Sequence, residues 1–138
     1  MKYQYFISSR YRNRDIVLEL TKKLRKKHKT VHNFMDTDPF HDMSTDPEET
    51  MKKFEATVNW RENHIVKHLF KKDMAALKNS KIIIVLLPGG KSTHIEAGVA
   101  YGLGKKLILI GEQKNAESLY LIFDKCFPDI DSFIKDLK

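Results

Sequence analysis

Apolar residues recur along the chain in short continuous runs, separated by longer segments in which they return every three or four positions. Continuous runs are typical of parallel strands covered on both faces, and the periodic segments are typical of amphipathic helices. The clearest run, at residues 82–87, reads Ile-Ile-Ile-Val-Leu-Leu. The runs predict five strands, at residues 3–8, 30–35, 81–87, 106–110 and 124–127, the last as a short edge strand.

Helices are predicted between these strands. Ile16, Leu20 and Leu24 share one face of a helix over residues 12–28, because they recur at helical spacing. The other predicted helices cover residues 47–80, with a break near Trp60, residues 93–103 and residues 129–137. A segment rich in Asp, Pro, Ser and Thr predicts a loop at residues 36–47.

The alternation of strands and helices predicts an α/β fold. We expect a single domain over residues 1–138, doubly wound, with a mostly parallel five-stranded sheet and helices on both faces, as in flavodoxin-like and Rossmann-like proteins. A chain of 138 residues is long enough to bury a core of this kind.

The composition limits the cellular environments in which this protein is expected. No apolar run approaches the roughly 18 residues of a membrane span, and the N-terminus lacks an apolar segment of signal-peptide length. Membrane association and export are therefore not expected. Cys126 is the single cysteine, which excludes an intrachain disulfide and fits a cytoplasmic protein.

The net charge of +7 favours anionic partners. The Lys and Arg residues are dispersed, so solvated helix surfaces account for most of them, and a small phosphorylated ligand is the next interpretation. A nucleic-acid groove is the weakest interpretation, because no motif that combines aromatic and basic residues accompanies the charge.

All six glycines lie between Gly89 and Gly111, directly after the most apolar strand. The Gly89–Gly90 turn leaves backbone N–H groups open to a ligand, and it is followed by Glu96 in the first turn of the predicted helix. Two interpretations of Glu96 stay open. Thr93 and Glu96 fit a T-x-x-E capping box, while a carboxylate at the carboxyl ends of parallel strands can act as a nucleophile or general base.

The segment after the first strand combines hydroxyl groups with arginines. Ser8, Ser9, Arg10 and Arg14 precede or open a helix, which predicts an anion site. The alternative is a serine N-cap with solvent-facing arginines. The chain has neither G-x-x-x-x-G-K-[ST] nor G-x-G-x-x-G, so no dinucleotide site and no cofactor are predicted.

Two further positions could carry chemistry. Asp73 lies on the apolar stripe of its predicted helix, where a charge needs a partner or the edge of a pocket, although a surface position is an equal alternative. His64 and His68 have a spacing that can bind zinc. No third ligand is evident, so surface histidines are expected and no metal site is predicted.

Three segments together resemble the nucleoside 2-deoxyribosyltransferase family, whose superfamily includes nucleoside-monophosphate N-glycosidases. They are Tyr-Phe-Ile-Ser-Ser-Arg at 5–10, Asp-Met-Ala-Ala-Leu-Lys-Asn-Ser-Lys at 73–81, and the stretch at 88–105 that contains His-Ile-Glu-Ala-Gly. The third is the most specific. The resemblance covers most of residues 3–138 in order, apart from an unfamiliar middle at 36–60.

The resemblance implies an enzyme that cleaves the N-glycosidic bond of a nucleoside or nucleoside 5′-monophosphate. Glu96 would attack the anomeric carbon and form a covalent glycosyl ester, which a second base or water would then release. Tyr5 matches the tyrosine that orients this nucleophile. Asp73 matches the acidic position near the base, where it could hydrogen-bond or protonate the departing ring.

The resemblance also implies a substrate site and a partner. Ser9, Arg10, Arg14 and Ser92 correspond loosely to phosphate contacts. Independently of the resemblance, His94 lies two residues before Glu96 and could touch a ligand, although an exposed position in the loop is an equal alternative. Asn115 could correspond to an asparagine lent to a neighbouring subunit. Members of the family are usually dimers or larger, so the resemblance implies a homodimer or larger homo-oligomer.

Two departures from the family pattern leave the activity open. Ala97 follows the nucleophile where a larger aliphatic residue is common, and residues 36–60 are polar. The alternative function is a non-catalytic nucleotide-binding sensor on the same scaffold, since fold does not fix function.

Overall fold

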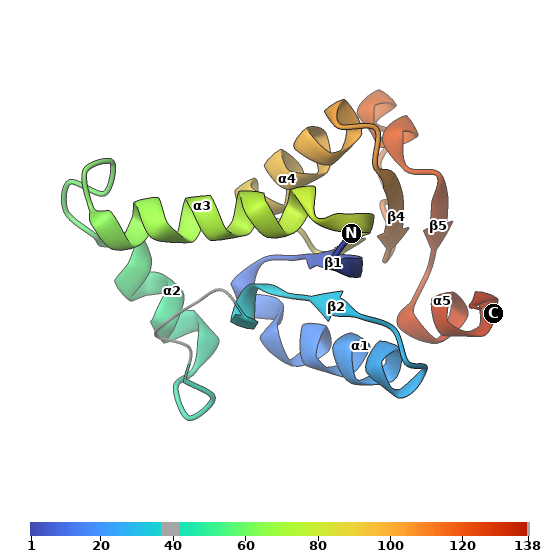
Figure 1. Cartoon of the computed structure of the whole chain (residues 1–138), viewed down its shortest axis with the longest axis horizontal. Coiled ribbons are helices and arrows are strands. Elements are labelled where there is room, and N and C mark those ends of the chain that lie inside the picture. Colours follow the sequence, from blue (N-terminus) through green and yellow to red (C-terminus); the bar gives the residue numbers. More distant parts are fainter. Residues whose placement is uncertain (37–41, 138) are drawn as a thin grey trace.

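The structure is a computed structural model that describes residues 1–36 and 42–137, so part of the predicted loop at 36–47 lies outside the described residues. Its centre is an all-parallel sheet in the order β2-β1-β3-β4-β5 (Figure 1). The strands are β1 (Tyr3–Ser8), β2 (Val31–His32), β3 (Ser80–Leu86), β4 (Lys106–Ile110) and β5 (Lys125–Phe127). The predicted five-stranded parallel sheet is confirmed.

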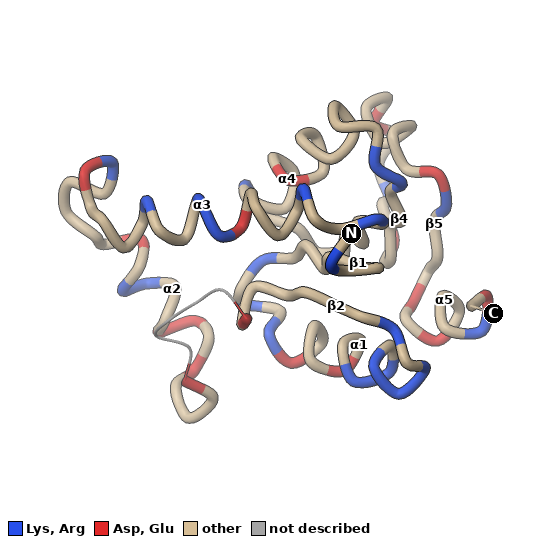
Figure 2. The backbone as a smooth tube through the Cα atoms, viewed as in Figure 1, with Lys and Arg blue, Asp and Glu red and all other residues tan. Residues whose placement is uncertain are grey.

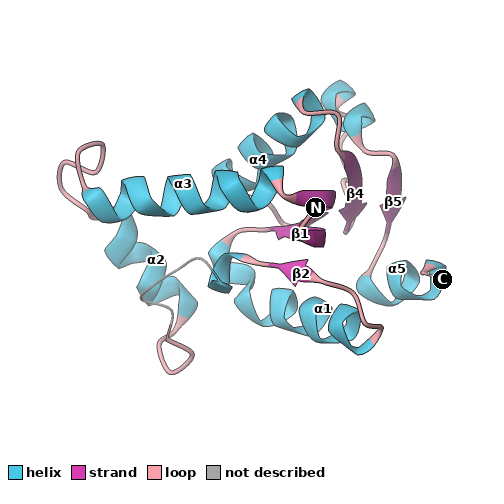
Figure 3. Ribbon diagram, in the orientation of Figure 1, coloured by secondary structure: helices cyan, strands magenta, loops and turns pink. Residues whose placement is uncertain are grey.

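Helices cover both faces of this sheet (Figure 3). The α-helices are α1 (Arg14–Lys26), α2 (Pro47–Glu55), α3 (His64–Lys78), α4 (Lys91–Gly102) and α5 (Ile130–Asp136), and the 3-10 helices are η1 (Tyr11–Asn13), η2 (Phe34–Asp36) and η3 (Ser118–Ile122). One apolar cluster joins α1 and α5 to the sheet, and a second joins α3 and α4 to the opposite face. The predicted doubly wound α/β fold is therefore confirmed.

The two clusters follow from the alternation of side chains along each strand. In β3, Ile84 and Leu86 belong to the α1–α5 cluster, while Ile83 and Val85 belong to the α3–α4 cluster. Both faces are apolar because both are covered by helices. Among the described residues, no helix is both long and apolar enough to cross a membrane.

Two predicted boundaries near the site differ from the structure. The second strand ends at His32 rather than residue 35, because side chain–backbone hydrogen bonds turn the chain: Asn33 Oδ1 accepts from Met35 N, and Asp36 Oδ2 accepts from Asn33 N. The helix expected to begin at Thr93 begins at Lys91.

The predicted break near Trp60 is confirmed. The chain leaves α2 at Glu55 and re-enters a helix at His64, where the Asn63 side chain accepts hydrogen bonds from Ile65 N and Val66 N as an N-cap. Helix α2 and the first half of α3 extend beyond the sheet (Figure 1). Figure 2 shows the Lys and Arg residues spread over several elements.

Candidate active site

The strand order places a topological switch point between β1 and β3, where ligands of open parallel sheets bind beyond the carboxyl ends. Short hydrogen bonds join the loops that leave these two strands. Ser9 Oγ donates to Leu86 O at 2.8 Å, and Asn13 Nδ2 donates to Pro88 O at 2.6 Å and to Ser9 Oγ at 2.9 Å. The sequence did not single out Asn13, although it fixes one loop against the other.

Glu96 lies in the second turn of α4, and Ser8 Oγ donates a 2.7 Å hydrogen bond to its Oε1. The expected capping box is wrong. Because α4 begins at Lys91, Thr93 is the third helical residue, and its Oγ1 accepts from Gly90 N at 3.2 Å. Thr93 supplies the cap contact itself, so Glu96 has no capping role and its carboxylate is directed to the end of β1.

The surroundings of Glu96 raise the pKa of its carboxyl from 4.5 to about 7. Burial of the half-buried side chain is the largest cause, the hydrogen bond from Ser8 opposes it, and the negative charge of Asp73 adds to it. Asp73 is half-buried on α3. The structure therefore brings the two carboxylates predicted from the sequence together, between β1, α3 and α4.

The prediction that Tyr5 orients Glu96 is wrong. Side chains alternate along β1, so Tyr5 shares a face with Ile7, whereas Ser8 lies on the face that α4 covers. The Tyr5 ring is buried in the α1–α5 cluster and packs edge to face against Phe133, with the ring centroids 6.1 Å apart. Ser8 is the residue of β1 that hydrogen-bonds to Glu96, and its expected contact with substrate stays a prediction.

A cavity of about 830 Å³ opens at the switch point. Its walls come from the loop after β1, from α2, from the first half of α3 and from the start of α4. The predicted ligand contacts that line it are Ser9, Arg10, Gly89, Gly90 and Ser92. Its basic side chains are Arg10, Arg12, Lys53 and Lys91, and its apolar ones include Phe34, Met51, Phe54, Val66 and Leu69.

Glu96 and Asp73 lie just beyond the lining of this cavity. Each stands one helical turn from a residue that does line it, Thr93 on α4 and Leu69 on α3. The lining of this cavity therefore stops one helical turn short of both carboxylates.

Three predicted substrate contacts lie outside the lining of this cavity, and their contact with a substrate stays a prediction. Arg14 is buried and donates to Asp42 O and Thr45 O, at 3.3 and 2.7 Å, so it holds the segment before α2 and does not line the cavity. His94 contacts Gly90 O at 2.8 Å and Tyr120 Oη at 2.7 Å with its two ring nitrogens. Asn115 is exposed and outside the cavity, and its expected role in a neighbouring subunit stays untested.

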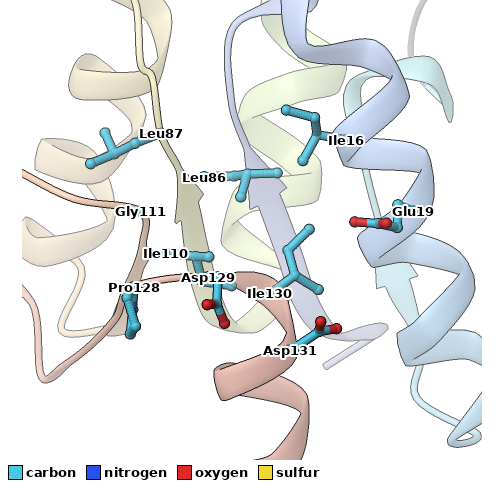
Figure 4. A pocket seen from close by; sticks show the side chains of 10 residues that line it. All are labelled: Ile16, Glu19, Leu86, Leu87, Ile110, Gly111, Pro128, Asp129, Ile130 and Asp131. Atoms are coloured by element: carbon cyan, nitrogen blue, oxygen red, sulfur yellow. The ribbon is translucent and has the colours of Figure 1, made fainter.

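A second cavity of about 390 Å³ lies on the other face of the sheet, between α1 and α5 (Figure 4). Glu19, Asp129 and Asp131 contribute carboxylates to its lining, among apolar side chains such as Ile16 and Ile130. Its acidic lining disfavours a phosphorylated ligand. Among the described residues, no three His, Cys, Asp or Glu side chains gather as metal ligands would.

Fold and site together define a doubly wound α/β protein with a carboxylate pair at its switch point, and two solved structures share this fold. A 2-deoxyribosyltransferase from the psychrotolerant bacterium Bacillus psychrosaccharolyticus is 18% identical, with a TM-score of 0.66 over 97% of this chain and 91% of that chain. A CMP N-glycosidase from Clostridium botulinum is 18% identical, with a TM-score of 0.52 over 95% of each chain.

No protein-family model and no curated protein sequence matches the chain. The two structures support, at the level of the fold, the resemblance to nucleoside 2-deoxyribosyltransferases seen in the sequence.

Proposed function

We propose that this protein cleaves the N-glycosidic bond of a nucleoside 5′-monophosphate, with Glu96 as the nucleophile. The observation that carries the proposal is the placement of Glu96: half-buried, hydrogen-bonded to Ser8 and beside Asp73, at the switch point of the sheet. A carboxylate held in this way is suited to covalent catalysis. The solved structures with this fold are a 2-deoxyribosyltransferase and a CMP N-glycosidase, which supports glycosyl chemistry at a nucleoside.

The proposed reaction has two steps. A carboxylate oxygen of Glu96 forms a bond to C1′ of the sugar while the C1′–N bond breaks, and the departing ring nitrogen takes the electron pair together with a proton from Asp73. Water, or a second base, then attacks C1′, the ester bond returns its electron pair to Glu96, and Asp73 accepts the proton of the attacking group. This sequence retains the configuration at C1′.

The cavity supports a phosphorylated substrate. Arg10 and Lys91 lie in its lining beside the Gly89–Gly90 turn, where the first backbone amides of the twelve-residue helix α4 have no acceptor within the helix. The apolar side chains from α2 and α3 form the opposite wall, which suits a planar base.

One observation favours a second candidate, a nucleotide-binding module without turnover. The cavity lining stops one helical turn short of Glu96 and Asp73. In that case a nucleotide would bind between α2 and the start of α4 without contact to either carboxylate.

An assay of base release distinguishes the proposed enzyme from the nucleotide-binding module. Nucleosides and 5′-monophosphates are incubated with the protein, with and without a second base, and free base is measured by chromatography. We expect release from a monophosphate and a loss of at least about 10³-fold in Glu96→Gln, which keeps the size of the side chain and an acceptor for Ser8.

The control is Glu112→Gln, which changes an exposed glutamate outside both cavities and should retain full activity. Nucleotide binding without base release would support the binding module and contradict the enzyme.

A further inference from the structure

Resting on the function proposed above, we infer that Ser8 is the positioning residue of this site: its hydroxyl holds the Glu96 carboxylate at the end of β1 and favours its ionised form, in place of Tyr5, to which the family resemblance assigned the orienting role.

The position of Ser8 is rigid. It is the last residue of β1, it pairs with Val85 of β3, and only 1% of its surface is exposed. Strand β1 is hydrogen-bonded on both sides, to β2 and to β3. Because a serine side chain has one heavy-atom torsion, Oγ can reach Glu96 Oε1 at 2.7 Å with little loss of conformational entropy.

The groups around Glu96 show why this hydroxyl matters. The residues of β3 and β4 that face α3 and α4 are apolar, including Val85 and Leu109. From α3 the charged group that faces Glu96 is Asp73. Within α4, the nearby His94 directs its ring nitrogens to Gly90 and Tyr120.

Burial and Asp73 both favour the neutral form of Glu96, and the Ser8 hydrogen bond opposes them. An O–H donor binds an ionised carboxylate roughly twice as strongly as a neutral acceptor. Ser8 therefore keeps part of the Glu96 population in the anionic form that the nucleophile requires, and it does so at a fixed geometry.

The test compares Ser8→Ala, Ser8→Thr and Ser80→Ala. Ser80 is a matched control, because it is also a buried serine, whose hydroxyl donates a 2.7 Å hydrogen bond to Ala76 O at the opposite end of β3. Two quantities are measured for each variant: the pH dependence of kcat/KM for base release, and the titration midpoint of the Glu96 carboxyl by ¹³C NMR.

We expect Ser8→Ala to move both midpoints upward by about one pH unit. Activity should then fall about tenfold at pH 6, with a much smaller loss at pH 9, where Glu96 is ionised in both proteins. Ser8→Thr retains a hydroxyl and should keep the wild-type midpoints, and Ser80→Ala should shift neither.

An unchanged NMR midpoint in Ser8→Ala, or a loss of activity by the same factor at every pH, would overturn the inference, because a merely structural role has no pH dependence of this kind. The NMR readout also separates this inference from the proposed function. A shifted midpoint in a protein that releases no base would support the Ser8–Glu96 coupling and contradict the enzyme, and an unshifted midpoint in an active enzyme would contradict Ser8 alone.

Discussion

At the scale of single residues, the central feature is a carboxyl group that folding moves into a less polar environment. In the unfolded chain Glu96 has the ordinary pKa of 4.5, and in the folded protein burial raises the pKa to about 7. Between these values the folded protein holds a proton that the unfolded chain has released. Protonated Glu96 therefore stabilises the fold at low pH, and this contribution is lost as pH rises through about 7.

This linkage predicts how Glu96→Gln changes stability. Glutamine is neutral at every pH, so the variant gains stability relative to wild type as pH rises from 5 to 8, by up to about 3 kcal/mol. Urea unfolding of both proteins at several pH values in this range measures the difference. A difference in unfolding free energy that stays constant with pH would show that Glu96 is not buried in the way described.

The chemically important residues could be identified from the sequence, but the directions in which their side chains point could not. Glu96 and Asp73 were identified because a carboxylate near a glycine turn and one on an apolar stripe are both unusual. The partner of Glu96 was misassigned to Tyr5, although the alternation along β1 already separates Tyr5 from Ser8. The capping box failed because the helix starts two residues before Thr93, and helix starts are poorly defined by sequence pattern.

At the scale of elements, α2 forms one wall of the cavity but buries none of its own residues. The contacts between α2 and the rest of the molecule include a cluster of charged side chains. Arg12 of η1 donates to Glu48 through Nε and Nη2, at 2.6 and 3.1 Å, and to Glu55 through Nη2 at 2.9 Å. Glu48 and Glu55 lie two turns apart on α2, so one guanidinium holds both ends of the helix.

Arg12→Gln should therefore loosen α2 without unfolding the sheet. We expect amide hydrogen exchange over residues 47–55 to accelerate roughly three- to tenfold at low salt, with β1 and β3 unchanged, because the ion pairs are partly exposed and of moderate strength. Added salt screens the ion pairs. It should therefore accelerate the exchange of α2 in wild type and reduce the difference in exchange rate between wild type and Arg12→Gln.

The matched control is Lys22→Gln, which removes an exposed positive charge from α1. Equal exchange of α2 in Arg12→Gln and wild type would show that other contacts hold this wall of the cavity.

The sequence predicted which segments form strands and helices more accurately than it predicted the lengths of these elements. The pattern of apolar residues predicted the five strands of the described sheet and the break near Trp60. It overestimated β2, because Asn33 and Asp36 satisfy backbone groups with their own side chains, and a hydrophobicity pattern does not register such bonds. The cavity wall formed by α2 was not predicted, since it depends on Arg12 meeting two glutamates about 40 positions further along the chain.

At the scale of the whole molecule, the strand order determines where chemistry can occur. The sheet reverses its direction of growth between β1 and β3, and the loops from these strands carry the hydroxyl, amide and glycine groups of the site. The sequence predicted this edge of the sheet because parallel strands expose their carboxyl ends together. It did not predict which cavity forms there, because packing of α2 and α3 decides that.

The central claim is that Glu96 forms a covalent bond to the sugar, and peptide mass spectrometry tests it most directly. The protein is mixed with the 5′-monophosphate that releases its base fastest, quenched in acid within the first turnover and digested. The account predicts that the peptide containing Glu96 gains the mass of the sugar phosphate, and that Glu96→Gln gains none. Base release at the wild-type rate in Glu96→Gln, with the peptide unmodified in both proteins, would contradict it.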